Sequence, residues 1–583
     1  MTFLNRTDTP FFKKVSLAIK TFSFTELGMF SIFLLICLIT GLSLMWTLNT
    51  RFLVDVPHKG GSLVEGIIGS PRFINPLLAI SEADEDITSL IYSGILKATL
   101  DGNLINDLAN ELTISEDGLE YTVVLKDNVY FHDGEPVTTD DIEFTIKKAQ
   151  DSLLKSPKRL NWIDVTTRKE SEKKIIFTLK QPYSPFIENL TMGILPEHMW
   201  ENLDSDQFSA SIFNTEPIGS GPYTIKKIKR SSGGLPILYE LAPFDSYALG
   251  EPYIKKLILR FYSNEDDVLS AYEKGNIESL SSVPPQKITQ TISNKTTVEH
   301  SPLPRVFGVF FNQNRAPIFI HKEVRVALNT AIDKERIVQE VLSGYGNVPQ
   351  GPVFLESFTK DGSDDIATTA PPSKTDAAIS ILTKAGWVLN PETGIMEKKI
   401  GGETTQLAFS VSTSNVTELK ATALILQEEW RKIGAEMDIK VFETSNLNQD
   451  IIRPRKYDAL LFGEIIGRDF DLYPFWHSSQ RNDPGLNIAM YTNISADKLL
   501  EEIRLTTNIK TKIEKYKDFE KLILEDAPAI FIYTPYFIYL VPRKINNLTL
   551  GNVTTPSERF MNVHDWYVPV SYTHLTLPTN REV

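Results

Sequence analysis

The chain has 583 residues, a formal net charge of −14 and a pI of about 5.3, and 42% of its residues are hydrophobic. This length exceeds what one hydrophobic core usually supports, so we expect two large lobes or several domains. The acidic balance argues against nucleic-acid binding, which requires a basic face. The single cysteine, Cys37, excludes an internal disulfide and any paired-cysteine metal or redox motif.

The N-terminal region contains a long apolar segment, Leu27–Thr50, that carries no charged residue. A membrane-spanning helix needs about 20 apolar residues. No small-x-small cleavage site follows Met45, so residues 27–50 are expected to form a retained transmembrane anchor rather than a cleaved signal. Basic residues are more frequent before this segment than after it, which predicts a cytoplasmic segment 1–26 and an extracytoplasmic remainder.

Beyond the anchor, strand and helix patterns alternate without a visible repeat. Residues 121–125 alternate as in a half-buried strand. Thr138 and Asp141 have the spacing of a helix capping box, and Asp333 is expected to cap a later helix. Trp430 lies on the apolar stripe of a helix that a strand follows at once, so we expect it in the core of an α/β lobe.

The C-terminal residues 571–583 show no periodicity and resemble translated sequencing-adapter sequence. We therefore exclude them from fold reasoning and expect a non-native, disordered tail.

Common catalytic signatures are absent from the sequence. It contains no GxSxG elbow, no HExxH, no Walker A loop and no GxGxxG after a strand. None of the eight histidines pairs with another at helical spacing, which argues against a zinc site on a helix. We expect neither enzyme activity nor a cofactor.

Residues 467–477, GRDFDLYPFWH, follow an apolar strand and place two aspartates among aromatic side chains. Such a cluster suits catalysis, ligand capture or a packed loop. Asp469 and Asp471 as an acid/base pair would make the chain a cell-surface hydrolase. However, side chains at i and i+2 of an extended segment point to opposite faces. A loop ion pair of Arg468 with Asp469 above packed aromatics is the structural alternative.

Several segments occur in the order typical of one protein family, and they are 69–112, 124–146, 217–225, 274–278, 310–338, 378–387, 426–441 and 519–541. Their sequences include YFHDGEPVTTDDI, PIGSGPYTI, KGNIE and FFNQNRAPI. Through them the chain resembles, from about Gly61 to Pro569, the solute-binding proteins of ABC importers in the oligopeptide/dipeptide/nickel-binding family (family 5).

The resemblance implies a two-lobe, periplasmic-binding-protein-like α/β fold of the large class with an inserted subdomain, preceded here by one transmembrane helix. The implied domains are lobe I (60–91 with 216–300 and 528–570), an insert in lobe I (92–215) and lobe II (301–527). It also implies a monomer that captures a peptide or another small solute and delivers it to ABC permease subunits in the membrane. A ligand-sensing module on the same anchor is an alternative.

The resemblance further implies which residues meet the ligand. Asp469 would pair with the free amino group of a peptide, with Asp471 as second choice. The remaining expected contacts are aromatic walls, an arginine for a ligand carboxylate and lining residues of the N-terminal segment: Phe470, Tyr473, Trp476, Arg305, Arg72, Phe73 and Asn75. No metal site is expected, because His477 alone lies near the cleft.

Overall fold

The computed structural model describes residues 23–51, 53–291, 295–353, 373–468, 470–506 and 508–573. The chain forms two compact units, one made of its N-terminal part up to His58 with the part after Tyr567, and one spanning Lys59–Tyr567. The predicted cytoplasmic segment lies outside the described residues up to position 22, and so does the predicted tail from position 574.

The first unit contains helix α2 (Phe24–Arg51) and strands β1 (Leu53–Val56) and β23 (Val570–Thr573). The part of α2 over Phe24–Thr47 is long and apolar enough to cross a membrane, a property that anchors and signal sequences share. Strands β1 and β23 pair antiparallel. Residues 571–573 of the predicted tail belong to β23, and the disorder expected for 571–583 stays a prediction.

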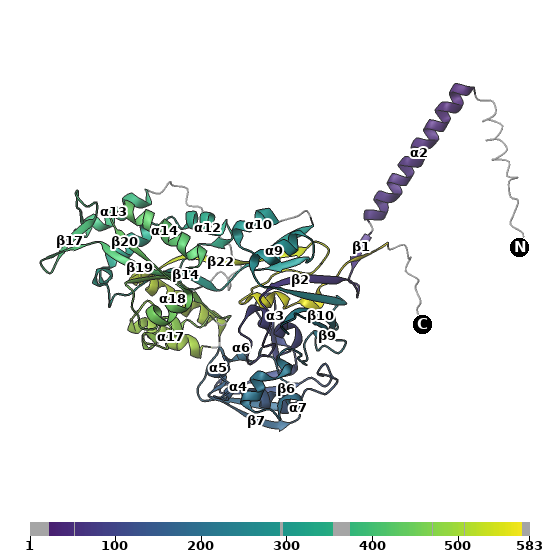
Figure 1. Ribbon diagram of the computed structural model, residues 1–583, viewed down its shortest axis with the longest axis horizontal. Coiled ribbons are helices and arrows are strands. Elements are labelled where there is room, and N and C mark those ends of the chain that lie inside the picture. Colours follow the sequence, from purple (N-terminus) through teal and green to yellow (C-terminus); the bar gives the residue numbers. More distant parts are fainter. Residues whose placement is uncertain are drawn as a thin grey trace, which may run out of the picture. The chain divides into compact units, whose positions relative to one another are not determined.

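Lobe I of the second unit combines strands before and after an insert with a C-terminal segment (Figure 1). Its strands are β2 (Ser62–Ile68), β9 (Tyr223–Arg230), β10 (Pro236–Pro243), β11 (Lys256–Tyr262), β12 (Ser279–Ser281) and β13 (Thr296–Pro302). Its helices are α3 (Glu82–Ile91), α9 (Glu265–Glu273), α10 (Pro285–Thr291), η6 (Pro556–Phe560) and η7 (Val563–Asp565).

A buried charge network fastens α3 and η6 to the sheet of lobe I. Arg559 donates from Nε to Glu65 at 2.7 Å and from Nη1 and Nη2 to Asp86 at 2.6 Å each. The hydroxyls of Tyr539 and Ser279 donate to the second oxygen of Glu65. Buried ion pairs are favourable only when hydrogen bonds satisfy their polar atoms, as they do here. The network thus fixes α3, one wall of the site described below.

The insert follows α3 and folds around its own four-stranded sheet, β5-β6-β8-β7. Its strands are β3 (Leu96–Ala98), β4 (Leu104–Asn106), β5 (Ala109–Ile114), β6 (Glu120–Leu125), β7 (Val165–Ser171) and β8 (Lys174–Leu179). Its helices are α4 (Thr139–Gln150), α5 (Arg159–Trp162), α6 (Phe186–Asn189), α7 (Glu197–Trp200), α8 (Ser205–Ala210) and η1 (Ile212–Asn214). The predicted strand at 121–125 and the capping box of Thr138 and Asp141 are both confirmed.

Lobe II holds the strands β14 (Arg305–Phe311), β15 (Gly346–Asn347), β16 (Val388–Leu389), β17 (Met396–Ile400), β18 (Glu403–Gln406), β19 (Ala408–Ser414), β20 (Glu436–Phe442) and β21 (Ala459–Ile465). Its longer helices are α11 (Lys322–Ala331), α12 (Lys334–Leu342), α13 (Lys374–Lys384), α14 (Thr417–Lys432), α17 (Ile494–Leu505) and α18 (Ile509–Asp526). Its short helices are η2 (Pro317–Ile320), α15 (Thr444–Asn446), the π-helix η4 (Leu447–Ile452), α16 (Tyr473–Trp476) and η5 (Ser478–Gln480). The predicted cap Asp333 and the core position of Trp430 are confirmed.

Strand β22 (Ala529–Pro542) runs through both lobes. Its first half pairs with β14 of lobe II, and its second half pairs with β13 of lobe I. One continuous mixed sheet results, ordered β20-β19-β21-β14-β22-β12-β2-β11-β10-β9. The chain passes between the lobes again at Leu303–Pro304, between β13 and β14. Two neighbouring crossings are the arrangement that a hinge requires. Because residues 59–567 form one unit, the exact domain bounds stay a prediction.

Candidate ligand-binding site

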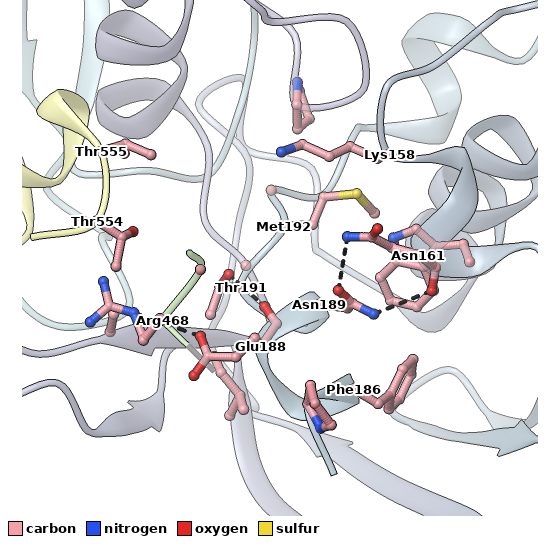
Figure 2. A pocket seen from close by; sticks show the side chains of 18 of the residues that line it. Lys158, Asn161, Phe186, Glu188, Asn189, Thr191, Met192, Arg468, Thr554 and Thr555 are labelled. Atoms are coloured by element: carbon pink, nitrogen blue, oxygen red, sulfur yellow. Dashed lines mark hydrogen bonds and ion pairs between the residues drawn. The ribbon is translucent and has the colours of Figure 1, made fainter. Parts of the chain in front are cut away.

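A cavity of about 1040 Å³ is lined by lobe I, the insert and lobe II together. Lobe I contributes residues of α3 and of the segment around η6, and lobe II contributes the loop after β21 (Figure 2). The insert contributes α5, α6 and the segment that follows α6. The lining residues include Glu85, Lys97, Asp107, Lys158, Asn161, Phe186, Glu188, Asn189, Met192, Tyr247, Arg468, Asp471, Phe475, Arg504, Thr554 and Thr555. The cavity therefore depends on all three parts being close together.

Arg468 in the loop after β21 connects the three parts. Its Nη2 donates to Glu558 at 2.5 Å, and its Nε lies 3.7 Å from Glu188 (Figure 2). Its Nη1 donates to the carbonyl of Asn552 at 3.4 Å. Only 9% of the Arg468 side chain is exposed. Glu558 is itself held by the backbone N–H and the hydroxyl of Thr554. The guanidinium of lobe II is thus bound by groups of lobe I and the insert.

Asp469, the first choice for a ligand ammonium, lies outside the described residues. Asp471, the second choice, lines the cavity but is engaged by the protein. Arg504 donates to both of its oxygens, at 2.6 Å from Nη2 and 3.0 Å from Nε. The hydroxyl of Tyr183 in the insert donates to Asp471 at 3.3 Å. The charge of Asp471 is therefore already balanced, and this residue joins lobe II to the insert.

The aromatic residues expected to line the cavity have different positions and contacts in the structure. Trp476 is fully buried among Phe310, Tyr491 and Phe531, so it packs in the core instead of lining the cavity. Tyr473 is partly buried, and the guanidinium of Arg504 lies 3.8 Å from its ring centroid. Phe470 packs against the same core as Trp476. Its φ of 52° lies in the left-handed region, which is strained for a residue with a side chain.

The N-terminal residues expected near the ligand have structural roles or face solvent. Asn75 is fully buried, and its amide bonds Asn214 and the backbone of Leu77. The backbone N–H groups of Arg72 and Phe73 both donate to Asp84, while the side chain of Arg72 is exposed. None of the three belongs to the described lining of the cavity.

Arg305 begins β14, directly after the second crossing between the lobes. Its Nε is buried and has no hydrogen-bond partner among the described residues. Burial lowers the pKa of its guanidinium, and the charges of Glu82 and Glu85 on α3 oppose that shift. Arg305 is not part of the described cavity lining, but Glu85 is.

Sequence reasoning missed the lobe I and insert contributions to the cavity, above all Lys97 and Asp107. Their signal in the sequence is weak, since each is a single charged residue in a short segment, LKA and NDL, that matches no binding motif. Among the described residues, no group of three His, Cys, Asp or Glu side chains is placed to hold a metal ion.

The fold and this three-walled cavity define the class of the protein. Residues 103–484 match the family described as bacterial extracellular solute-binding proteins, family 5 Middle. The chain belongs to this family. It is an extracytoplasmic substrate-binding component of an ABC transporter and not an enzyme.

Similar proteins and structures cover most of the chain. It is 28% identical over 520 residues to the oligopeptide-binding protein AppA of Bacillus subtilis, covering 88% of this chain and 92% of AppA. It is 25% identical over 489 residues to the nickel-binding periplasmic protein of Escherichia coli, covering 80% and 86%. The structure of AppA with a nonapeptide matches at 27% identity with a TM-score of 0.65, covering 88% and 100%. The substrate-binding protein CtaP of Listeria monocytogenes matches at 26% with 0.72, covering 88% and 99%.

Proposed function

We propose that the chain captures peptides in the cavity between its lobes and presents them to the permease subunits of an ABC importer, while α2 stays in the membrane as an anchor. The observation that carries the proposal is the cavity of about 1040 Å³ with walls from lobe I, the insert and lobe II. This volume lies at the upper end of ligand sites, which hold about 300–1,000 Å³. A ligand larger than one amino acid is therefore accommodated.

The charges around the cavity support a zwitterionic ligand such as a peptide. The side chains that line it carry both signs, and several of them are already paired, as Arg468 is with Glu558 and Asp471 is with Arg504. A ligand with one ammonium and one carboxylate adds no net charge to this balance. One similar protein supports the same ligand class, since AppA is named as oligopeptide-binding and its structure contains a nonapeptide.

Within this proposal, Asp469 binds the ammonium of the peptide and Arg305 binds a ligand carboxylate. The buried, unpartnered Nε of Arg305 supports its role, because burial without a partner leaves a donor available. Tyr473 and Phe470 position Arg504 and the loop rather than facing the ligand on their own.

The proposal is tested by thermal unfolding of the purified chain with and without a mixture of peptides. A ligand that binds only the folded state raises the melting temperature by mass action. We expect a rise with peptides and none with a matched mixture of free amino acids. The absence of a shift with every peptide mixture would refute peptide binding.

A further inference from the structure

One wall of the cavity carries polar atoms that lack hydrogen-bond partners. Among the described residues, Thr88 Oγ1, Tyr92 OH and Asp107 Oδ1 are buried without a partner, and all three residues line the cavity. Tyr92 is 5% exposed and Asp107 is 2% exposed. Leaving one buried polar group unsatisfied costs about 1–3 kcal/mol. Three such groups among the residues that line the cavity are available to polar groups of a ligand.

The same wall carries two opposite charges that do not touch. Lys97 lies on β3, and Asp107 follows β4, the partner strand of β3. Burial lowers the pKa of Lys97 and raises the pKa of Asp107, and each charge opposes the shift of the other. In the described part of the chain, no salt bridge within 4.0 Å joins them. The two charges thus act on each other without forming a direct ion pair.

Lys97 is held in place by a neighbour from lobe I. Its Nζ donates to the hydroxyl of Tyr247 at 2.7 Å. Tyr247 is 4% exposed and packs edge-to-face on His564, with ring centroids 5.6 Å apart. The Lys97 ammonium has three N–H donors, so two remain for other acceptors once the bond to Tyr247 is made.

We propose that Lys97 and Asp107 form a subsite for an uncharged amide side chain of the bound peptide, that of Gln or Asn. The amide carbonyl accepts a hydrogen bond from Lys97, and the amide NH₂ donates to Asp107. The hydroxyls of Thr88 and Tyr92 supply further bonds to the same group. This inference rests on the proposed function, because it assumes that the ligand is a peptide.

The choice of an amide follows from charge and hydrogen bonding. Asp565 acts on Lys97 as Asp107 does, and Lys126 acts on Asp107 as Lys97 does. These two cations and two carboxylates carry no net charge together, so a charged ligand side chain would add a charge without compensation. A glutamate would face Asp107, and a lysine would face Lys97. An apolar side chain would leave both groups and both hydroxyls unsatisfied. A carboxamide offers an acceptor and two N–H donors in one planar group without net charge.

The test measures affinities by isothermal titration calorimetry on the full chain in detergent. The probes are alanine tetrapeptides that carry Gln, Glu, Lys or Met at each position in turn. At one position, we expect Gln to bind at least about tenfold more tightly than Glu, Lys and Met, which corresponds to one or two unsatisfied buried groups. Equal affinity of Gln and Met at every position would overturn the subsite, whereas failure of every peptide to bind would overturn the proposed function itself and the subsite with it.

Two variants test the assignment to these residues. Asp107→Asn removes one of the two carboxylates that act on Lys97, so one positive charge is in excess and the preference at that position is expected to change from Gln to Glu. Lys97→Met removes one of the two cations that act on Asp107, so one negative charge is in excess and the preference is expected to change to Lys. The matched control is Lys173→Met, which removes a lysine of the insert that is not part of the cavity lining and pairs with the exposed Asp127, and it should leave the preference unchanged. Unchanged preferences in both variants would refute the assignment, and if neither folds the wild-type series decides.

Discussion

Arg468 and Glu558 form an ion pair at 2.5 Å between lobe II and lobe I, across the cavity. The two residues are 90 positions apart in the sequence. A second ion pair, between Arg504 and Asp471, holds the same loop. The hydroxyl of Tyr183 in the insert donates a hydrogen bond to Asp471. The arrangement of the three parts around the cavity is therefore supported by direct contacts of the protein. A ligand that contacts all three parts would favour the same arrangement.

Replacing Arg468 with Met is expected to weaken the contact of lobe II with lobe I and the insert. The charge-assisted hydrogen bond to Glu558 and the ion-pair contact with Glu188 are lost. A partly buried pair of this kind contributes about 1.4 kcal/mol, or roughly tenfold in the population of this arrangement. Hydrogen–deuterium exchange over residues 183–193 and 470–476 should then become faster, and peptide affinity should fall.

In the double variant Arg468→Met/Glu558→Gln, the effects of the two single substitutions on peptide affinity should not add up, because both substitutions break the same ion pair. Lys180→Met is a suitable comparison, because its partner Asp164 lies in the same insert and both side chains are largely exposed. If Arg468→Met and Lys180→Met change the hydrogen–deuterium exchange rates equally, the bridging role of Arg468 is contradicted.

The two aspartates of the loop are expected to differ in what they control. Asp469→Ala should weaken peptide binding by more than about 1 kcal/mol, since a carboxylate–ammonium hydrogen bond is lost. Asp471→Ala should instead lower the free energy of unfolding by about 1–3 kcal/mol, because Arg504 loses the acceptor that balances it. Calorimetric titration and urea unfolding of both variants separate these outcomes, and the reverse pattern would make Asp471 the ligand contact.

His132 is expected to make the stability of the chain depend on pH. Its Nε2 donates to the carbonyl of Gly221 and its Nδ1 accepts from the N–H of Gly219, so the neutral ring fits and the protonated ring does not. Burial lowers the pKa of His132 to about 4. A histidine with a lowered pKa contributes stability that is present above about 6.5 and is lost as the pH falls towards 4.

The measurement compares the free energy of unfolding at pH 7 and pH 4.5 in the wild type and in His132→Phe, which keeps a ring against Phe244. The variant should lose about 2 kcal/mol less than the wild type over this range, a value reduced for partial exposure. His58→Gln, at an exposed position, should retain the wild-type pH dependence. An identical dependence in His132→Phe would show that another group titrates.

Arg559 is expected to be essential for the stability of lobe I. Arg559→Met leaves the buried carboxylates of Glu65 and Asp86 without a cation, which costs about 3–5 kcal/mol. Denaturant unfolding should show this loss, whereas Arg230→Met, which breaks a surface pair with Glu216, should cost less than about 1 kcal/mol. Burial raises the pKa of Asp86 to about 6 despite the charge of Arg559, so the loss should be smaller below pH 6. A similar loss of unfolding free energy in Arg559→Met and Arg230→Met would mean that the buried network stabilises the fold no more than a surface ion pair does.

The anchor is tested by fractionation of cells that produce the full chain. The apolar helix Phe24–Thr47 should keep the protein in the membrane fraction, with residues before position 24 retained at its N-terminus. Recovery of a soluble form that begins after residue 50 would identify the helix as a cleaved signal.

The sequence allowed some of these features to be predicted and not others. Local patterns were sufficient where the determinants are neighbours in the chain, as for the Thr138–Asp141 capping box and the stripe that carries Trp430. Trp476 could not be placed this way, because α16 has four residues and shows no periodicity. The partners of Arg468 lie in lobe I and the insert, and only the folded chain brings them together.

Peptide capture in the cavity is tested most directly by native mass spectrometry of the chain purified from the cells that produce it, followed by release of the ligand under denaturing conditions. We predict additional mass that resolves into peptides on release and disappears in Asp469→Ala. A cavity that instead releases nickel complexes, sugars or free amino acids, with no peptide in any preparation, would contradict the account.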